Sequence, residues 1–254
     1  TNPYINWTQL ADFKFELPPT IEQEKIVEFI TAASQLTKTL SGLKKSLEIA
    51  YYAYLENLHS FGVLNGFKLL DKFVDDDAPI CYGILMPGKH FDGGVPVIKV
   101  RDFTGSGFNV DSLLHCDPEI EKKYHRSRLI KNDLLLSIRG TVGKLETISS
   151  SLDGSNITQD SARIRISDNS DRILIKHYLK SQSARRFISS RTVGNAVKGI
   201  NIGDVRKIPI PIGVPLEILY LIEEIHKNFK RIERLLESAK DVYSSLKFQE
   251  SVVL

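Results

Sequence analysis

The chain lacks the features of secreted, membrane-spanning and metal-binding proteins. Its 254 residues include two cysteines, Cys81 and Cys116, which are too few to crosslink a domain of this size or to form a zinc site. No run of 18 or more apolar residues occurs, and no basic segment followed by an apolar one opens the chain, so the sequence predicts neither a membrane span nor a secretory signal. We therefore expect a cytoplasmic protein.

Signatures of catalysis are also scarce. No glycine-rich cofactor loop follows a strand, and Asn2-Pro3-Tyr4 matches only part of the Asn-Pro-Pro-aromatic motif of amino-methyltransferases. The carboxylates of segment 117–123 lie in one short loop, whereas a metal-dependent nuclease holds its cation between separate strands. We expect no catalytic residue, no metal and no cofactor in the chain itself. A stand-alone nuclease or methyltransferase remains the alternative.

Charge is distributed unevenly. Residues 61–213 contain 23 lysines and arginines against 17 aspartates and glutamates, whereas the two flanks together contain 11 against 14. A basic centre suits an anionic partner such as nucleic acid, although an average domain can reach this excess by chance.

Two segments 195 positions apart resemble each other. The corresponding residues are Ile5-Asn6, Leu10, Phe13, Phe15, Leu17, Glu22 and Glu28 in the first segment, and Ile200-Asn201, Val205, Ile208, Ile210, Ile212, Glu217 and Glu223 in the second. Such self-similarity indicates a repeated structural unit. Because the chain begins with Thr1 inside the first unit, we expect it to be part of a longer protein.

Each repeat leads into a long amphipathic helix. In the first, Thr20 is the expected N-cap after Pro18-Pro19, and acidic residues favour the first turn. Apolar residues then recur at alternating steps of four and three, the spacing of a coiled-coil seam. The seam consists of Leu36, Leu40, Leu43 and Leu47 in the first helix, and of Ile225, Phe229, Ile232 and Leu236 in the second. We expect the helices to pair with each other or with another copy; the alternative is two amphipathic helices packed on the body.

The region between the helices is rich in predicted strands. Short strands are expected at 95–100, 133–138 and 161–166, bounded by glycine-containing turns, and a helix at 173–190. The predicted fold class is therefore α+β, with a β-rich domain flanked by two long helices.

In order along the chain, five segments resemble signatures of the specificity subunit of type I restriction-modification systems. They are LPPTIEQ at 17–23, YGILMPG at 82–88, GVPVIKVRD at 94–102, NDLLLSIRGTVG at 132–143 and GNAVKGIN at 194–201. The second repeat departs from the pattern, because IGVPLE at 212–217 replaces the Pro-Pro and Glu-Gln helix entry.

The resemblance implies a division of the chain. Residues 1–19 are the tail of a preceding unit and the helix entry, 20–60 a spacer helix, 61–213 a target-recognition domain, and 214–254 a second spacer helix. The chain thus resembles a half-subunit or a C-terminal half, with fragment and natural half-subunit both open.

The resemblance also implies partners. The recognition domain would read one half of a split site in double-stranded DNA. The helices would dock methyltransferase subunits, which carry S-adenosylmethionine and methylate adenine, and restriction subunits would join. We expect two chains to self-associate, while a monomer with its seams closed internally is the alternative. A coiled-coil assembly protein whose body binds another protein remains a rival reading.

Candidate DNA contacts are cations, amides, hydroxyls and one carboxylate, at strand ends and in glycine-containing loops. They are Lys89, Lys99, Arg101, Asp102, Arg139, Thr141, Lys144, Asn156, Thr158, Gln159, Asn195 and Lys198. The amides suit adenine, and Arg139 is expected to hold a phosphate. For each residue a solvated or turn-stabilising role is the alternative. The recognised base sequence is not predicted.

Overall fold

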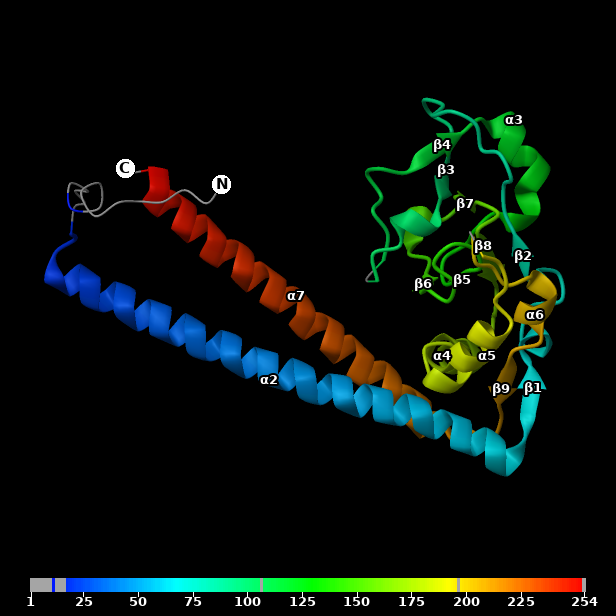
Figure 1. Cartoon of the computed structure of the whole chain (residues 1–254), viewed down its shortest axis with the longest axis horizontal. Helices are drawn as coiled ribbons and strands as arrows, with labels where there is room; N and C mark the ends of the chain where they lie inside the picture. Colours follow the sequence, from blue (N-terminus) through cyan, green and yellow to red (C-terminus); the bar gives the residue numbers. More distant parts are fainter. Residues whose placement is uncertain (1–10, 12–16, 106, 196, 253–254) are drawn as a thin grey trace. The chain divides into compact units, whose positions relative to one another are not determined.

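The computed structural model describes residue 11 and residues 17–105, 107–195 and 197–252. The chain divides into two compact units (Figure 1). The helical unit comprises Thr1–Glu48 and Asn228–Leu254, and the body comprises Ile49–Lys227. The first copy of the sequence repeat lies mostly outside the described residues.

Two long helices dominate the chain. Helix α2 spans Thr20–Asn65 and therefore continues beyond the predicted end at residue 60, and α7 spans Leu216–Val252. Thr20 is already helical, so the expected N-cap shifts to Pro19, whose carbonyl accepts from the N–H groups of Glu22 and Gln23. The Gln23 side chain also donates to the Pro18 carbonyl at 2.7 Å. The proline pair thus starts the helix because the Pro19 carbonyl meets two unpaired N–H groups of the first turn, while the Pro18 carbonyl holds the Gln23 side chain.

In the helical unit, an ion pair and a cation–π contact join the two helices. Lys44 Nζ lies 2.9 Å from Glu233 Oε1 and 5.4 Å from the centre of the Phe229 ring. Ile232 and Leu236 of α7 are buried, as the predicted seam requires.

On α2 the predicted seam is only half correct. Leu40 and Leu47 are half-buried, but Leu36 and Leu43 are 60% and 48% exposed. Thr37 and Lys44 are half-buried instead, which shifts the inner stripe by one position. The apolar pattern is wider than one seam, and the contact of Lys44 with Glu233 decides which half of it faces α7.

The described residues of the body form nine short strands in three sheets. Their bounds are β1 (Phe67–Leu69), β2 (Cys81–Tyr82), β3 (Val95–Ile98), β4 (Leu114–Cys116), β5 (Leu134–Ser137), β6 (Leu145–Thr147), β7 (Asn156–Ile157), β8 (Ser161–Ile164) and β9 (Pro209–Pro211). The sheet orders are β1-β9, β2-β8-β5-β6 and β4-β3-β7, and the described strand pairs are antiparallel except for β3 with β7.

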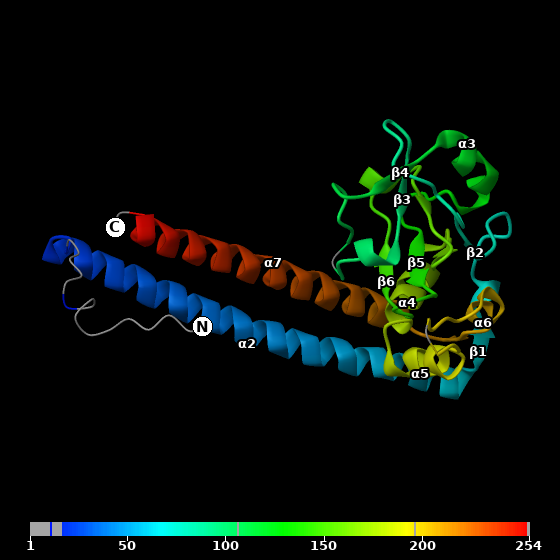
Figure 2. The same ribbon diagram turned by 45° about the horizontal axis from the view of Figure 1, so that its top comes forward.

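Shorter helices surround these sheets (Figure 2). They are α3 (Pro118–Glu121), α4 (Asn169–Tyr178), α5 (Gln182–Ser190), α6 (Ile202–Arg206) and the 3-10 turns η1 (Leu70–Lys72), η2 (Val100–Asp102), η3 (Lys122–Ser127) and η4 (Ser150–Leu152). The single helix predicted at 173–190 is two helices, because the Ser181 hydroxyl accepts the Ala184 N–H at 3.2 Å and begins α5 anew.

Strand β5 explains why three leucines occur in a row. Leu134 and Leu136 pack into one apolar cluster and Leu135 into a second cluster on the opposite side. Side chains alternate along a strand, so a strand covered on both faces has no polar position. The first cluster also takes Leu55 and Leu58 from α2, which fixes the inner part of α2 to the body.

Candidate nucleic-acid interface

Backbone hydrogen bonds bring together four segments that lie far apart in the sequence. The Thr158 N–H donates to the Ile98 carbonyl at 3.2 Å, the Ile138 N–H to Asp160 at 2.8 Å, and the Gly140 N–H to Lys198 at 2.9 Å. These bonds join segments 98–104, 158–160, 138–144 and 193–199, which we call the strand-end loops. Most of the polar residues singled out in the sequence lie in them.

The 138–144 turn is held open by one side chain. Ser137 Oγ donates to the Thr141 carbonyl at 2.6 Å and accepts the Lys144 N–H at 2.8 Å. Gly140 and Gly143 adopt φ of 72° and 90°, which other residues rarely tolerate. Arg139, Thr141 and Lys144 are exposed on this turn. The turn therefore presents two cations and a hydroxyl from a fixed backbone.

The 193–199 segment forms a small hairpin beside that turn. The N–H of Val193 and the N–H of Gly199 each donate to the other residue's carbonyl at 2.9 Å, and Gly199 forms a β-bridge with Arg139. Asn195 and Lys198 are exposed on the hairpin. The predicted grouping of Arg139 with Lys198, almost 60 positions later, thus has a structural basis.

In segment 98–104, Arg101 is exposed but Asp102 is not. The buried Asp102 carboxylate accepts the Lys99 N–H at 2.8 Å and lies 3.7 Å from Arg101 Nε. The prediction that Asp102 contacts DNA is corrected: its carboxylate caps the η2 turn. Lys99 is half-buried in this segment.

Asn156 is also removed from the candidate contacts. Its side chain is 0% exposed; the amide nitrogen donates to Glu121 Oε1 at 2.9 Å, and the oxygen accepts from Ser127 Oγ at 2.7 Å. An amide saturated inside the protein cannot reach adenine. Thr158 is buried as well, whereas Gln159 is half-buried and stays a candidate. The sequence pattern did not separate these three neighbours because alternation and burial depend on partners from other strands.

Lys89 is exposed in the segment that joins β2 to β3, outside the strand-end loops. The exposed cations within the loops are Arg101, Arg139, Lys144 and Lys198. Among the described residues, no ion pair within 4.0 Å involves Arg139, Lys144 or Lys198. Positive charge that is not neutralised within the protein is suited to phosphate oxygens.

The sequence analysis missed three arginines next to this surface. Arg185 and Arg186 are exposed on α5, and Arg191 follows its last turn and precedes the hairpin. The signal was the basic pair itself, which lay inside a segment considered only as a helix with a buried face.

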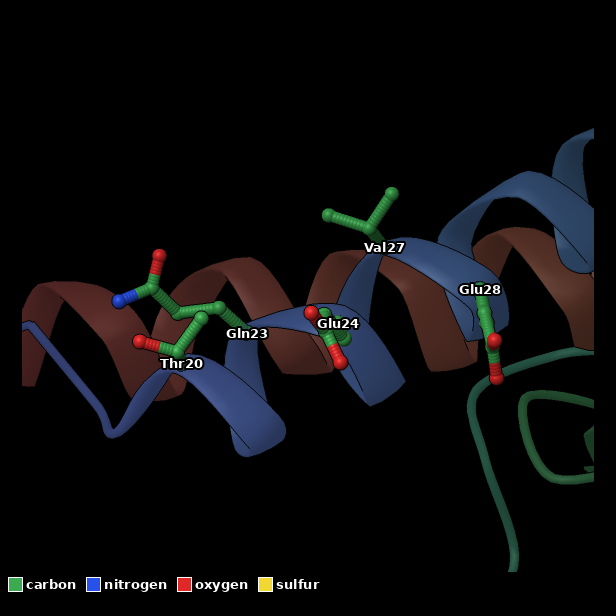
Figure 3. Close-up of a pocket in the computed structure, with 5 residues that line it drawn as sticks. All are labelled: Thr20, Gln23, Glu24, Val27 and Glu28. Carbon is green, nitrogen blue, oxygen red and sulfur yellow. The ribbon is translucent and has the colours of Figure 1, made fainter.

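A hollow on α2 lacks the features of a small-ligand pocket. A hollow of about 410 Å³ on α2 is lined by Thr20, Gln23, Glu24, Val27 and Glu28, whose side chains spread in different directions along one helix (Figure 3). A ligand pocket normally has polar groups that converge. Among the described residues, no three His, Cys, Asp or Glu side chains are grouped to hold a metal, and no helix is long and apolar enough to cross a membrane.

A buried polar cluster lies where α2, α4 and α7 meet in the body. Tyr51 Oη lies 2.8 Å from His177 Nδ1, and His177 Nε2 lies 2.6 Å from Glu223 Oε2. Lys176 Nζ donates to the same carboxylate at 2.7 Å, and the His226 ring stacks on Tyr51 at 4.9 Å. Burial lowers the pKa of His177 to about 4 and that of His226 to about 3. Every member has a packing or bonding partner inside the body, so the cluster indicates a structural joint.

Comparison with known proteins adds a relative to these observations. No protein-family model matches the chain. The chain is 26% identical over 177 residues to the Type I restriction enzyme EcoBI specificity subunit of Escherichia coli, which covers 68% of this chain and 35% of that protein. The chain resembles a type I specificity subunit.

Solved structures extend the likeness to the fold. The HsdS subunit of Thermoanaerobacter tengcongensis matches 92% of this chain and 59% of its own with a TM-score of 0.53 and 18% identity. A chain from a structure of complex assembly and conformational transition in the type I R-M system matches 93% and 59%, with a TM-score of 0.52 and 18% identity. The α+β class and the specificity-subunit resemblance predicted from the sequence are confirmed. The chain spans 35% of the curated relative and 59% of each solved chain.

Proposed function

We propose that the chain is the part of a type I restriction-modification complex that binds DNA sequence-specifically and reads one half of a split target. The observation that carries this proposal is the strand-end loops, where exposed cations from three of the four distant segments meet on turns fixed by backbone bonds. The cations would hold phosphates, while Thr141, Gln159 and Asn195 can reach base edges. The relative's name supports the same role.

In this proposal, residues 61–213 are the target-recognition domain, and 20–60 and 214–254 are the spacer helices that form a coiled coil. The chain itself is non-catalytic and takes no cofactor. Methyltransferase subunits carrying S-adenosylmethionine would dock on the helices, and restriction subunits would complete the complex. A protein with this role would act on DNA in the cytoplasm.

The helical unit has a surface suited to such docking. Phe29, Leu36 and Leu43 repeat every seven residues on α2 and are exposed, and Leu235 of α7 is exposed too. An apolar stripe of this kind left in water marks a protein-binding surface. We propose that a methyltransferase subunit covers it.

Replacing Leu36 and Leu43 together by serine is expected to lower capture of the methyltransferase by about ten-fold or more, because the docking stripe loses its apolar area. Pull-down with purified subunits measures this. Lys38 and Lys45 have the same spacing on the same helix and are exposed, so their double serine variant is the control. Equal capture by both variants would place docking elsewhere.

We also propose that two chains associate, which would present two identical recognition domains to a palindromic split site. Apolar side chains of α2 outside that stripe, at Ile21, Val27 and Ile30, are exposed as well and support this association. Light scattering at high protein concentration tests it, and a monomer counts against self-association.

The deciding experiment is capture of the cognate methyltransferase by this chain, followed by selection from a random duplex library and sequencing of the bound DNA. A motif that is enriched only in the presence of the methyltransferase establishes a specificity module. Turnover by the purified chain with Mg²⁺ or S-adenosylmethionine would instead favour an enzyme. No effect of duplex at low salt would favour an assembly protein.

Substitution of Arg101 or Lys198 by alanine is expected to weaken DNA binding by the assembled complex while folding is kept. Both side chains are exposed. Each loss of a phosphate contact should lower affinity several-fold and reduce the slope of log K against log salt by about 0.9. Lys131→Ala removes an exposed cation elsewhere in the body and is the control. Unchanged binding for both variants would refute this surface.

A further inference from the structure

A segment rich in positive charge runs along one side of the body and ends at the strand-end loops. Residues 180–199 contain Lys180, Arg185, Arg186, Arg191 and Lys198 and no aspartate or glutamate. A solvated helix face usually carries both signs of charge. Five cations in 20 residues without a carboxylate therefore indicate an anionic partner.

The structure fixes this segment at both ends. At its start, the Gln182 N–H donates to Glu56 Oε1 of α2 at 2.7 Å, and Ala184 and Ile188 are buried in the apolar cluster. Figures 1 and 2 both draw α5 close to the inner end of α2. The face that remains outside presents Arg185 and Arg186 to solvent.

At its end, α5 passes directly into the candidate interface. The Arg191 guanidinium lies 3.8 Å from the centre of the Phe187 ring, and its Nε lies 3.8 Å from Asp204 Oδ1. Two residues later, Val193 pairs with Gly199, which itself bridges to Arg139. The arginines of α5 thus continue the positive surface of the strand-end loops towards α2.

Two carboxylates contact this segment, one near its start and one at Arg191. Glu56 accepts the N–H of Gln182, and Asp204 lies beside Arg191. Arg185 and Arg186 have no ion pair within 4.0 Å among the described residues. Their guanidinium groups can therefore bind phosphates without first breaking an ion pair within the described part of the protein.

We infer that α5 and the residue after it form a second, sequence-independent DNA contact, in which Arg185 and Arg186 of α5 and Arg191 beyond its end hold phosphates of the duplex beside the half-site, on the side where α2 packs. This inference rests on the proposed function and adds a part to it. Arginines that bind phosphate oxygens fix a protein on the duplex without reading its sequence, whereas the amide and hydroxyl candidates for base contacts lie in the strand-end loops. If the long helices space two recognition domains, as the proposed function has it, the DNA on the α2 side is the stretch between two half-sites, whose sequence is free.

The first test is the salt dependence of binding by the methyltransferase complex to random duplex. Arg185→Ala with Arg186→Ala is expected to reduce the slope of log K against log salt by roughly 1.8, because about 0.9 is lost for each phosphate contact. Affinity at physiological salt should fall about ten-fold. The control is Lys122→Ala with Lys123→Ala, which removes two exposed cations from η3 and should leave the slope unchanged.

A conservative pair separates charge from folding. Arg185→Lys with Arg186→Lys is expected to keep most of the slope, whereas a structural role of the guanidinium groups would not be rescued. The enriched motif should be the same in wild type and in both α5 variants, because the contact carries no base information.

The second test locates the contact on the DNA. Duplexes that contain the enriched motif are made with neutral methylphosphonate linkages on the spacer side or on the outer side of the half-site. The wild-type complex should bind the spacer-side methylphosphonate duplex more weakly than the unmodified duplex. The alanine variant should bind these two duplexes equally well, because its spacer-side phosphate contacts are already absent. Equal slopes for the alanine variant and the Lys122/Lys123 control, or a loss confined to the outer side, would overturn the inference. A complex that enriches no motif would contradict the proposed function, while the salt slopes still report on α5.

Discussion

Replacement of Gly83 by alanine is expected to destabilise the body by about 3 kcal/mol or more, at the upper end of overpacking effects. A Cβ at this position would lie 1.9 Å from the Ile157 carbonyl oxygen and 2.5 Å from its carbon. Both atoms belong to the backbone of β7, so no side-chain rotation can relieve the clash. Urea unfolding followed by circular dichroism measures the change.

The same glycine explains part of a sequence signature. The Gly83 N–H donates to the Thr158 carbonyl at 3.3 Å, and the Ile84 N–H donates to the Ile157 carbonyl at 2.8 Å. This close approach fixes the 158–160 segment of the strand-end loops. The glycine after Tyr82 is therefore needed for space, and Gly83→Ala should also abolish DNA binding by the complex.

Gly42 is the matched control for this prediction. It lies inside α2, and a Cβ there would meet nothing within 4 Å. Gly42→Ala should stabilise the helix by up to about 1 kcal/mol, the cost of glycine relative to alanine in a helix. A Gly83→Ala variant as stable as wild type would contradict the packing of β7. Loss of methyltransferase capture by Gly42→Ala would show that a partner approaches closely at this point.

The long helices and the buried strand were predictable because their signals are local. Repeating steps of three and four specify a helix, and the continuous leucines of β5 specify a strand covered on both faces. The side of α2 that faces α7 was not predictable from apolar spacing. Lys44 occupies an inner position because it contacts Glu233 and the Phe229 ring. The spacing of apolar residues in the sequence does not predict these contacts.

The candidate interface was predictable in part for the same reason. Glycine-containing turns with exposed Arg139 and Lys198 can be recognised in sequence, and their proximity follows from the pairing of Gly199 with Arg139. The roles of Asp102 and Asn156 could not be recognised, because an acid or amide at a strand end looks the same whether it faces solvent or closes a turn. Only the partners in space distinguish these cases.

The joint between α2, α4 and α7 makes the stability of the body depend on pH. In the unfolded chain His177 and His226 have the ordinary histidine pKa of about 6.5. In the folded body, burial lowers these pKa values to about 4 and about 3, although Glu223 opposes the shift in both. Lys176 of α4 and Lys180, just beyond the end of that helix, lower both pKa values further.

The direction of the change in stability with pH depends on which state, folded or unfolded, binds more protons. Between about pH 6.5 and 4 the two histidines are protonated in the unfolded chain but stay neutral in the folded body. Their contribution to the free energy of unfolding therefore falls as pH falls through this window and is constant above it. The slope reaches at most about 1.4 kcal/mol per pH unit for each histidine, and partial exposure of His226 reduces its share. Burial raises the pKa of Glu223, but the bonds from His177 and Lys176 outweigh it and lower the value overall. Glu223 therefore adds a further loss only below about pH 4.5.

His226→Phe isolates one histidine of this joint. The ring would keep its stacking on Tyr51, while the buried Nδ1, which has no hydrogen-bond partner among the described atoms, would be removed. We expect stability at pH 7.5 to be equal or higher, and the fall in urea midpoint between pH 7.5 and 5 to shrink by roughly half, since one of two titrating groups is gone. His125→Gln changes an exposed histidine and should leave the fall unchanged. A wild-type urea midpoint that is constant between pH 7.5 and 5 would show that neither histidine is held neutral. The joint would then lack the buried Tyr51–His177–Glu223 chain that fixes the inner parts of both long helices to the body.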